Sequence, residues 1–569
     1  MQSRNRIRTG LRRPRVTTPL ERPLPGEPSA ERADRPARTD KVVFGVAAAI
    51  TLCFVAWGVL ATDSLASASK TSLTWIIGNL GWAFVLSASG FVVFALWLAF
   101  SRYGRIPLGQ DDEQPEFRTI SWVAMMFSAG MGIGLMFYGV NEPLTHFVKP
   151  PPGTVEGGSD QAVQTAMATT MFHWTLHPWA IYAVVGLAIA YGSFRRGRSQ
   201  LISAAFAPLL GTKRTNGPAG RAIDVLAIFA TLFGSAASLG LGALQIGSGL
   251  EVAGWAGEVG NGILVGIIAV LTAAFVASAV SGVSKGIQWL SNINMVLAVV
   301  LAAFIFVVGP TVFILNLVPT ALGDYIREMA DMAGRTAASG GDATEAWLSG
   351  WTIFYWAWWI SWTPFVGMFI ARISRGRTIR QFVAGVILVP SGVSVVWFAI
   401  LGGTAIFTQR SGVDLAGQAT PEGQLFALLD NFPLAAVAGV VVMLLVAIFF
   451  VSGADAASIV MGTLSQRGSI TPNKRVVVFW GVLTGAVAAV MLLVGGSNAL
   501  TGLQNLTIIA ALPFLVIMIG LCVSLAKDLR SDPLIRREER VAEAMEKATA
   551  ELGPEEAALR AVEQVTAKR

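Results

Sequence analysis

The apolar stretch from Trp351 to Arg372 is unusually rich in tryptophan. On a helix, Trp358 and Trp362 are four residues apart and Trp359 and Trp362 are three apart, so their side chains adjoin. No carboxylate stands beside these indoles in the sequence. The ring faces suit a cation that cannot donate a hydrogen bond, of which a quaternary ammonium is the usual example. Membrane tryptophans also pack in helix bundles or anchor at the interface, and this stretch alone leaves both interpretations open.

A second stretch, Ser128 to Gly139, has glycine at three alternate positions, Gly130, Gly132 and Gly134. This spacing differs from the small-xxx-small pattern of a simple helix-packing face. Alternating glycines weaken a helix and expose backbone amides and carbonyls. Because transporters hold ions and substrates with such freed groups at the middle of the membrane, we predict a broken helix here.

Further candidate residues lie in other apolar runs. The helix that carries the tryptophan cluster is easily interrupted at Pro364 and Gly367. Thr231 and Ser235 share a helix face and offer oxygen to a hard monovalent cation, although such hydroxyls more often bond to their own backbone. Asp455 is a carboxylate in an apolar run, costly there and functional by default, or else a structural partner for a loop arginine. Additional aromatic candidates are Trp174, Trp179 and Tyr182.

Composition indicates which elements position these residues. Hydrophobic residues make up 54% of the 569-residue chain, charged residues only 14%, and the mean hydropathy is +0.61. A soluble domain carries about 25% charge, so we predict an all-α polytopic membrane protein. The two cysteines exclude a disulfide framework or cysteine metal cluster, and no P-loop or nucleophile elbow suggests an enzyme. Twelve spans are predicted, near 42–61, 82–100, 119–140, 165–192, 222–250, 262–281, 290–317, 348–371, 382–407, 433–462, 475–495 and 502–526.

The segments outside the spans predict the orientation. Residues 1–41 are basic and rich in proline, which predicts a disordered tail able to meet anionic lipid. Residues 527–569 follow the transporter core of 42–526, and their charge pattern predicts a helical tail. This tail is either a plain solvated helix or a regulatory one. Residues 318–347 predict a surface helix on the outer side. Alternate loops are rich in arginine and lysine, so the positive-inside rule places both termini in the cytoplasm.

The glycine and tryptophan spans are the third and the eighth, as two inverted five-helix repeats would place them. At these two motifs, 130–134 and 356–367, the sequence resembles the betaine/choline/carnitine transporter family over residues 42 to 526. The resemblance implies twelve membrane helices, with two inverted five-helix repeats of the LeuT type after two extra helices. It also implies a homotrimer in a bacterial cytoplasmic membrane that takes up quaternary ammonium compounds.

The resemblance also assigns site residues. Phe137 and Phe369 resemble gating aromatics. No cofactor is implied beyond the coupling sodium ion. The implied substrate site comprises Trp174, Trp179, Tyr182, Trp358, Trp359, Trp362 and the glycine stretch with Gly130, Met131, Gly132 and Gly134. The implied sodium positions comprise Thr231, Ser235 and Phe365 for the first, and Ser128, Met131, Phe449 and Ser452 for the second.

Two positions refine the expected function. Gly134 matches the betaine-type motif, whereas members that carry choline tend to have aspartate there. A zwitterion brings its own carboxylate, which favours a betaine-like substrate. Ser452-Gly453 replaces the usual Thr-Ser pair, which weakens the second sodium position. We expect a sodium symporter of glycine betaine or a related compatible solute that serves osmoprotection. The alternatives are ectoine, choline or carnitine transport with proton coupling or exchange, and a membrane osmosensor that binds betaine without moving it.

Overall fold

The computed structural model describes residues 38–552 except for 131, 282, 283 and 497. The described residues form helices and contain no β-strand, apart from an isolated bridge between Pro107 and Thr378. The helices that matter for the argument are α2 (Lys41–Leu60), α3 (Thr62–Phe100), α4 (Thr119–Gly130), α5 (Ile133–Val148), α6 (Asp160–Trp174), α7 (Leu176–Ala190), α10 (Pro218–Val252), α11 (Asn261–Ser281), α12 (Ser284–Val308), α13 (Thr311–Ala333), α14 (Gly341–Gly350), α15 (Thr352–Ile373), α16 (Ile379–Arg410), α17 (Gly423–Leu429), α18 (Ala435–Ser465), α19 (Lys474–Val494), α20 (Ala499–Arg530) and α21 (Pro533–Leu552).

The predicted all-α polytopic fold is confirmed. In the described part of the chain, nine helices are long and apolar enough to cross a membrane, or ten if the bent pair of α12 and α13 counts as one span. Each of the twelve predicted spans coincides with a helix or a broken pair. Two of the twelve predicted spans are not among these ten candidate spans. They are the broken pair of α4 and α5, and α15, which carries the tryptophan cluster. Five spans run from α4 to α12 and five from α15 to α20, after α2 and α3.

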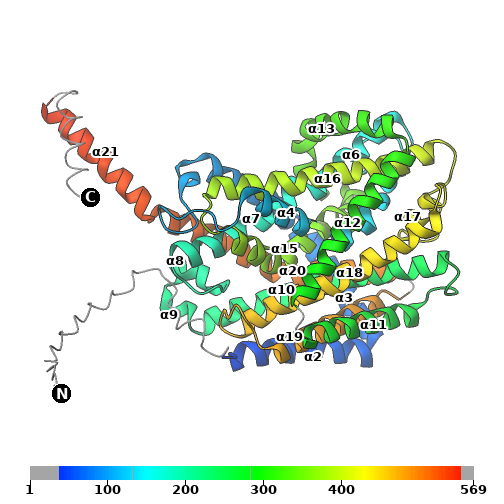
Figure 1. The fold of residues 1–569 in the computed structure, drawn as a ribbon, viewed down its shortest axis with the longest axis horizontal. Coiled ribbons are helices and arrows are strands. Elements are labelled where there is room, and N and C mark those ends of the chain that lie inside the picture. Colours follow the sequence, from blue (N-terminus) through cyan, green and yellow to red (C-terminus); the bar gives the residue numbers. More distant parts are fainter. Residues whose placement is uncertain (1–37, 131, 282–283, 497, 553–569) are drawn as a thin grey trace, which may run out of the picture. The chain divides into compact units, whose positions relative to one another are not determined.

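Two predicted boundaries were wrong. The span near 290–317 ends at Val308, where the chain bends by 109° at Gly309-Pro310 and continues as α13. The predicted surface helix therefore begins at Thr311 rather than 318 (Figure 1). Helix α3 begins at Thr62, twenty residues before the predicted 82, because hydropathy detects only the apolar part of a continuous helix.

The helices that carry the candidate residues lie at the centre of the bundle. In the most apolar window of the α6–α7 pair 94% of the residues are buried, and for α10 the value is 89%, against 17% for α11 and 28% for α2. Figure 1 shows α2, α11 and α19 lying together along one edge of the bundle. The well-buried helices can therefore line an internal site, while α2 and α11 present apolar surface outward.

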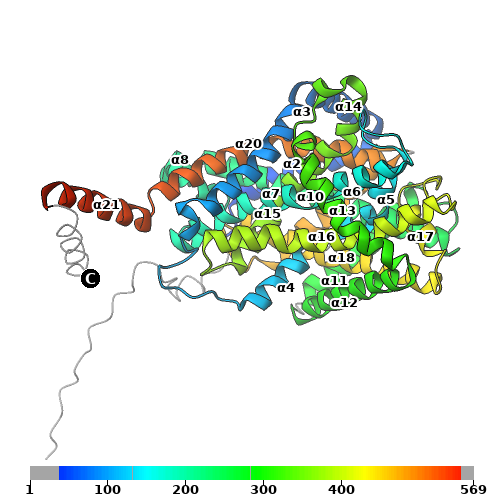
Figure 2. The same ribbon diagram turned by 90° about the horizontal axis from the view of Figure 1, so that it is seen from above.

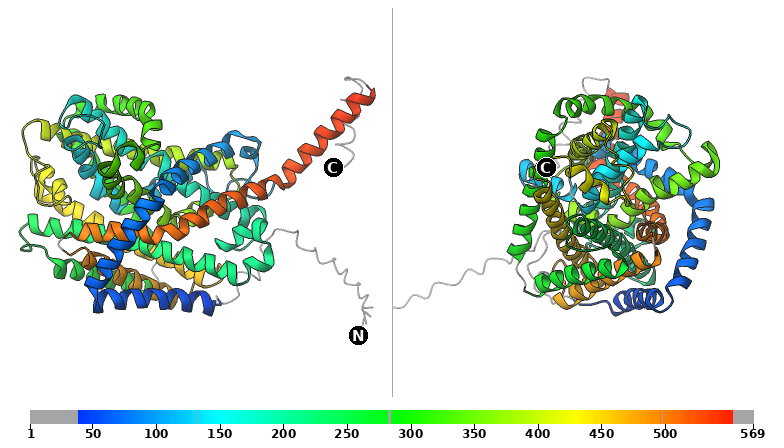
Figure 3. Two further views of the ribbon diagram at one scale, coloured as in Figure 1. Left: turned by 180° about the vertical axis from the view of Figure 1, so that it is seen from behind. Right: turned by 90° about the vertical axis from the view of Figure 1, so that its right-hand side faces the viewer.

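Glycines allow the central helices to approach each other. A Cβ on Gly367 of α15 would lie 2.9 Å from Val185 Cγ1 and 3.1 Å from the backbone nitrogen of Gly186 on α7. Such distances are shorter than a side chain tolerates, so the two backbones meet only because glycine stands there. Helix α3 crosses α20 at a steep angle on the other side of the bundle (Figures 2 and 3).

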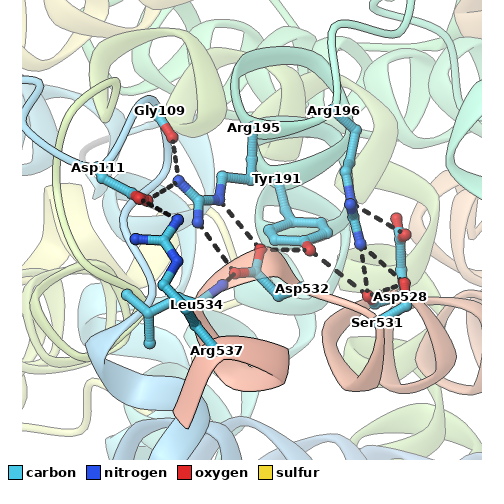
Figure 4. Close-up of polar contacts among 10 residues, drawn as sticks. All are labelled: Gly109, Asp111, Tyr191, Arg195, Arg196, Asp528, Ser531, Asp532, Leu534 and Arg537. Carbon is cyan, nitrogen blue, oxygen red and sulfur yellow. Dashed lines mark hydrogen bonds and ion pairs between the residues drawn. The ribbon is translucent and has the colours of Figure 1, made fainter. Parts of the chain in front are cut away.

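Ion pairs connect the junction between the C-terminal helices α20 and α21 to the rest of the bundle. Helix α20 runs to Arg530, four residues beyond the predicted end of the transporter core, and α21 projects away from the bundle (Figure 2). Arg195, at the end of the α7 span, donates to both carboxylate oxygens of Asp532 at 2.9 and 3.0 Å and to Asp111 at 2.6 Å (Figure 4). One guanidinium thus joins the loop before α4 to the junction between α20 and α21.

Candidate functional site

The predicted break in the glycine stretch is confirmed. Helix α4 ends at Gly130 and α5 begins at Ile133, with Gly132 at its N-cap in an extended conformation. Backbone groups between the two helices therefore have no place in a continuous helical ladder. Met131 and the side chain of Ser128 lie outside the described residues, so the parts assigned to Ser128, Gly130 and Met131 stay predictions.

A second break separates the aromatic residues of the fourth span. Helix α6 ends at Trp174 and α7 begins at Leu176, with Thr175 between them. The hydroxyl of Thr175 donates to the carbonyl of Met171 at 2.6 Å, which satisfies a carbonyl at the end of α6. Trp174 therefore comes from one helix end, and Trp179 and Tyr182 from the first turns of the next helix.

Helix α15, in contrast, continues through Pro364. Proline leaves the carbonyl four residues earlier, that of Ile360, without its usual amide donor. The hydroxyl of Thr363 donates to this carbonyl at 2.7 Å. The expectation that the helix is interrupted at this proline was wrong, because the neighbouring side chain supplies the missing hydrogen bond.

All six aromatic candidates surround one small cavity of about 40 Å³. Trp358 and Trp359 lie nearly parallel with ring centroids 4.7 Å apart, and Trp174 meets Trp359 edge-on at 5.0 Å. The remaining lining residues come from α5, α7 and α16. The full lining is Gly132, Gly134, Leu135, Trp174, Pro178, Trp179, Tyr182, Trp358, Trp359, Trp362 and Ser394. We call this cavity the aromatic box.

The box offers ring faces and few polar groups. None of its described lining residues carries a charge. Trp358 and Trp359 use their indole N–H groups outside it, donating to Ser238 Oγ and to the carbonyl of His173, each at 3.1 Å. Because ring faces bind cations through the aromatic quadrupole, the box is suited to a cation without N–H donors.

Gly134 is required by the close approach of two of these indoles. A Cβ at this position would lie 2.6 Å from Cη2 of Trp358 and 2.8 Å from Cη2 of Trp174. At Gly132, on the same wall, a Cβ would have no heavy atom of the described residues within 4 Å. The box therefore tolerates a side chain at one glycine of the motif and not at the other.

A second cavity, of about 190 Å³, lies on the other side of Trp362. Gly132 and Trp362 line both cavities. The lining includes residues of both predicted sodium positions, namely Ser235 and Phe365 of the first and Phe449 and Ser452 of the second, together with the predicted gating residue Phe369. This cavity therefore brings together residues of five helices beside the aromatic box.

The hydroxyls of the predicted sodium positions differ in their availability. The hydroxyl of Thr231 donates to the carbonyl of Ala227 at 2.8 Å and that of Ser452 to Ile448 at 2.8 Å, both in their own helices. Ser235 Oγ is buried and has no hydrogen-bond partner among the described residues. A donated hydrogen leaves the oxygen lone pairs of Thr231 and Ser452 available to a cation, and Ser235 alone of the three makes no hydrogen bond to a described residue. Phe137 is buried and packs on Tyr138 at 4.8 Å, so its gating role stays a prediction.

The sequence reasoning missed a buried carboxylate behind the box. Glu142 of α5 is fully buried, and its Oε2 accepts hydrogen bonds from Trp174 Nε1 at 2.6 Å and from the Tyr355 hydroxyl at 2.5 Å. Its Oε1 lies 2.6 Å from His173 Nδ1. The predicted span ended near residue 140, which placed Glu142 in a loop, whereas α5 continues to Val148. The argument that a carboxylate inside a span is functional by default was therefore applied only to Asp455. Asp455 itself is buried on α18.

The same carboxylate is part of a possible metal site. The ligand atoms of Glu142, His146 and His173 lie within 4.8 Å of one another. Both oxygens of Glu142, however, already accept hydrogen bonds from other side chains, and His173 uses its second nitrogen toward Thr352 at 2.9 Å. A metal ion would have to displace these bonds, so the geometry fits a hydrogen-bond network better than a metal centre.

Comparison with known proteins gives consistent matches. The profile of the betaine/carnitine/choline family of transporters matches residues 42–534. The betaine/ectoine transporter LcoP of Corynebacterium glutamicum is 50% identical over 500 residues, covering 88% of this chain and 79% of the relative. The glycine betaine transporter OpuD of Bacillus subtilis is 45% identical over 508 residues, covering 89% of this chain and 97% of the relative. A solved structure of a Na⁺-coupled sialic acid symporter aligns with a TM-score of 0.39 at 14% identity, covering 82% and 98% of the two chains.

Proposed function

Since this chain belongs to the betaine/carnitine/choline family of transporters, we propose that it imports glycine betaine or a related compatible solute together with sodium, by alternating access. The observation that carries the proposal is the aromatic box, six aromatic side chains around one cavity with no charged group in its described lining. A trimethylammonium group has no N–H donor that needs an acceptor, so the attraction of the ring faces can offset the hydration that it loses on leaving water.

The carboxylate of the substrate fits the other side of the same cavity. Gly132 and Gly134 line the box at the start of α5, where backbone amides are free of intrahelical partners. A helix N-terminus stabilises a negative charge. A zwitterion such as glycine betaine therefore finds a partner for each of its charged ends, whereas choline has no carboxylate to place there.

Sodium coupling is supported by the second cavity. Residues of both predicted sodium positions line it, and Ser235 has a free hydroxyl oxygen. No lysine or arginine stands among its described lining residues, which leaves the room for a mobile cation. We further propose a homotrimer in the bacterial cytoplasmic membrane with both termini in the cytoplasm, serving osmoprotection.

Uptake of labelled glycine betaine into proteoliposomes tests this function. We expect uptake under an inward sodium gradient and none when potassium replaces sodium, because the coupling ion provides the driving force. Empty liposomes are the control. Equal uptake with either cation would contradict sodium coupling and point to protons or exchange, and binding without uptake would point to an osmosensor.

Ectoine is the second candidate substrate. The relative that is 50% identical is named as a betaine/ectoine transporter. Ectoine carries N–H donors, and the hydroxyl of Ser394 in the box can accept one of them. Competition of unlabelled ectoine with labelled glycine betaine in the same vesicles distinguishes one substrate from two.

Gly134→Ala is expected to weaken glycine betaine binding about fivefold, since an added methyl group in a packed site costs at least about 1 kcal/mol. The new Cβ would meet the rings of Trp358 and Trp174, both of which wall the box. Gly132→Ala is the matched control, because a Cβ there meets no atom of the described part of the chain within 4 Å. Isothermal titration calorimetry with glycine betaine compares the affinities of the two purified variants. Equal affinities would contradict the packing argument.

A further inference from the structure

The buried carboxylate of Glu142 forms hydrogen bonds with groups directly behind the aromatic box. Trp174, which lines the box, donates its indole N–H to Oε2, and Tyr355 donates its hydroxyl to the same oxygen. The ring of Tyr355 is stacked on Trp359, another lining residue, with centroids 5.9 Å apart and planes 14° apart. Glu142 is therefore connected to two walls of the box.

The directions of these hydrogen bonds agree with an ionised carboxylate. An indole N–H and a phenol O–H act here as donors, so Oε2 accepts twice. With its proton on Nδ1, His173 donates to Oε1, and its Nε2 accepts from the hydroxyl of Thr352. Every bond then has one donor and one acceptor. A carboxylate has enough lone pairs for these three donors. With its proton on Nε2 instead, His173 would donate to Thr352 and accept at Nδ1 from a protonated acid, so the comparison of a charged with an uncharged ligand below distinguishes the two protonation states.

The charge of Glu142 alters the electron distribution of the Trp174 ring, which lines the box. A donor bonded to an anion is polarised, so the indole of Trp174 gains electron density on its faces. Cation–π attraction is electrostatic and grows with the negative potential of the face. An anion behind the box can thus stabilise a cation without contacting it, because the cationic end of the substrate meets the ring faces. His146, whose Nε2 lies 3.7 Å from Oε1, has no hydrogen-bond partner among the described residues and does not compete for these oxygens.

We propose that Glu142 is a positioning residue that sets the preference of the aromatic box for a cationic headgroup, acting through Trp174 and Tyr355. This inference rests on the proposed function, because it concerns how the same site distinguishes a quaternary ammonium from an uncharged group of equal shape.

The test compares two ligands of equal shape. Glycine betaine and 3,3-dimethylbutanoate share the carboxylate, and the trimethylammonium of the first is a tert-butyl group in the second. Their affinities are measured in detergent for the wild type and for Glu142→Gln, by titration and by competition. We expect glycine betaine to lose at least about tenfold in affinity in the variant, and the carbon analogue less than about threefold, because only the cation senses the charge.

Glu422→Gln is the matched control. Glu422 is also buried, but it stands at the N-cap of α17, and none of the aromatic lining residues donates to it in the described structure. It should leave both affinities unchanged. An equal loss of both ligands in Glu142→Gln would overturn the proposal, because it would mean a general disturbance of the box. A wild type that does not bind glycine betaine would instead contradict the proposed function itself.

A second pair of variants keeps the test valid if Glu142→Gln does not fold. Trp174→Phe and Trp179→Phe each replace one lining indole by a phenyl ring, but only the first removes a hydrogen-bond donor to Glu142. The preference for glycine betaine over its carbon analogue should fall more in Trp174→Phe. An equal fall in the two variants would overturn the role of the carboxylate.

Discussion

Replacing Trp362 by leucine is expected to weaken glycine betaine binding by about tenfold or more, while the protein stays folded. Trp362 lines the aromatic box on one side and the larger cavity on the other. Its ring is half-buried and meets Trp358 edge-on at 6.5 Å. Leucine is apolar but has no ring face, so the substrate loses a cation–π contact and the wall between the two cavities becomes thinner.

Isothermal titration calorimetry with glycine betaine measures binding, and size-exclusion chromatography of the same samples shows whether the protein is folded. Trp82→Leu is the control, because Trp82 is 57% exposed on α3 and lines neither cavity. It should bind like the wild type. Wild-type affinity in Trp362→Leu would mean that this tryptophan serves packing only, which was the alternative that its sequence left open.

The sequence was sufficient to predict the helices and the wall of the box. The length of an apolar run and the bilayer thickness together determine a span, so each predicted span coincides with a helix or a broken pair. The six aromatic residues were assigned through the family motifs, and the structure brings all of them to one cavity. Helix periodicity alone placed Trp358 and Trp362 on one face, but it could not show that Trp174 of another helix faces them.

What the sequence did not predict depends on contacts between distant segments. Glu142 has its partners 31 to 213 positions further along the chain, so no local pattern reveals that it accepts three hydrogen bonds. Ser394 reaches the box from α16 without any motif around it. The continuity of α15 through Pro364 depends on the rotamer of the Thr363 hydroxyl, which spacing does not specify.

The ion pairs that attach the C-terminal helix to the bundle could not be predicted from the sequence either. Charge pattern predicted a helix within 527–569, but not its partners. In the structure, the partners of Asp532 and Asp528 are Arg195, Arg196 and Arg198, more than 300 positions earlier in the chain. The positive-inside interpretation of the loops that contain these arginines did not reveal these partners. In the structure, the arginines are donors that hold the end of α20.

The second large effect is expected for Asp532→Ala, which should release α21 from the bundle. The side chains of Arg195 and Asp532 are 5% and 0% exposed, so the variant leaves a buried guanidinium with half of its acceptors (Figure 4). Breaking a buried pair by removing one partner costs about 3–5 kcal/mol. Beyond Asp532, α21 contacts the bundle through the buried side chain of Ile535 and through exposed ion pairs, which contribute little. We therefore expect local detachment of residues 533–552 rather than global unfolding.

Hydrogen–deuterium exchange of peptides from 533–545 measures this detachment. Protection should be lost in Asp532→Ala and kept in Asp160→Ala. The pair of Asp160 with Arg410 has a similar distance of 2.6 Å, but its side chains are 86% and 41% exposed, and surface pairs contribute little. Equal protection in Asp532→Ala and the wild type would show that other contacts hold the helix.

The pH dependence of this attachment follows from the same contacts. Burial alone would raise the pKa of Asp532, but hydrogen bonds from Arg195, the Leu534 amide and Tyr191 hold it below its ordinary value of 3.8. A carboxylate with a lowered pKa stabilises the folded state above its unfolded pKa, and this stabilisation is lost as the pH falls through the folded pKa. Protection of α21 in the wild type should therefore stay constant from pH 7 to about 5 and fall only below about 4, where Asp532→Ala shows no further loss. A loss of protection between pH 7 and 6 would instead require a histidine, and among the described residues the groups that hydrogen-bond to Asp532 are an arginine, a tyrosine and a backbone amide.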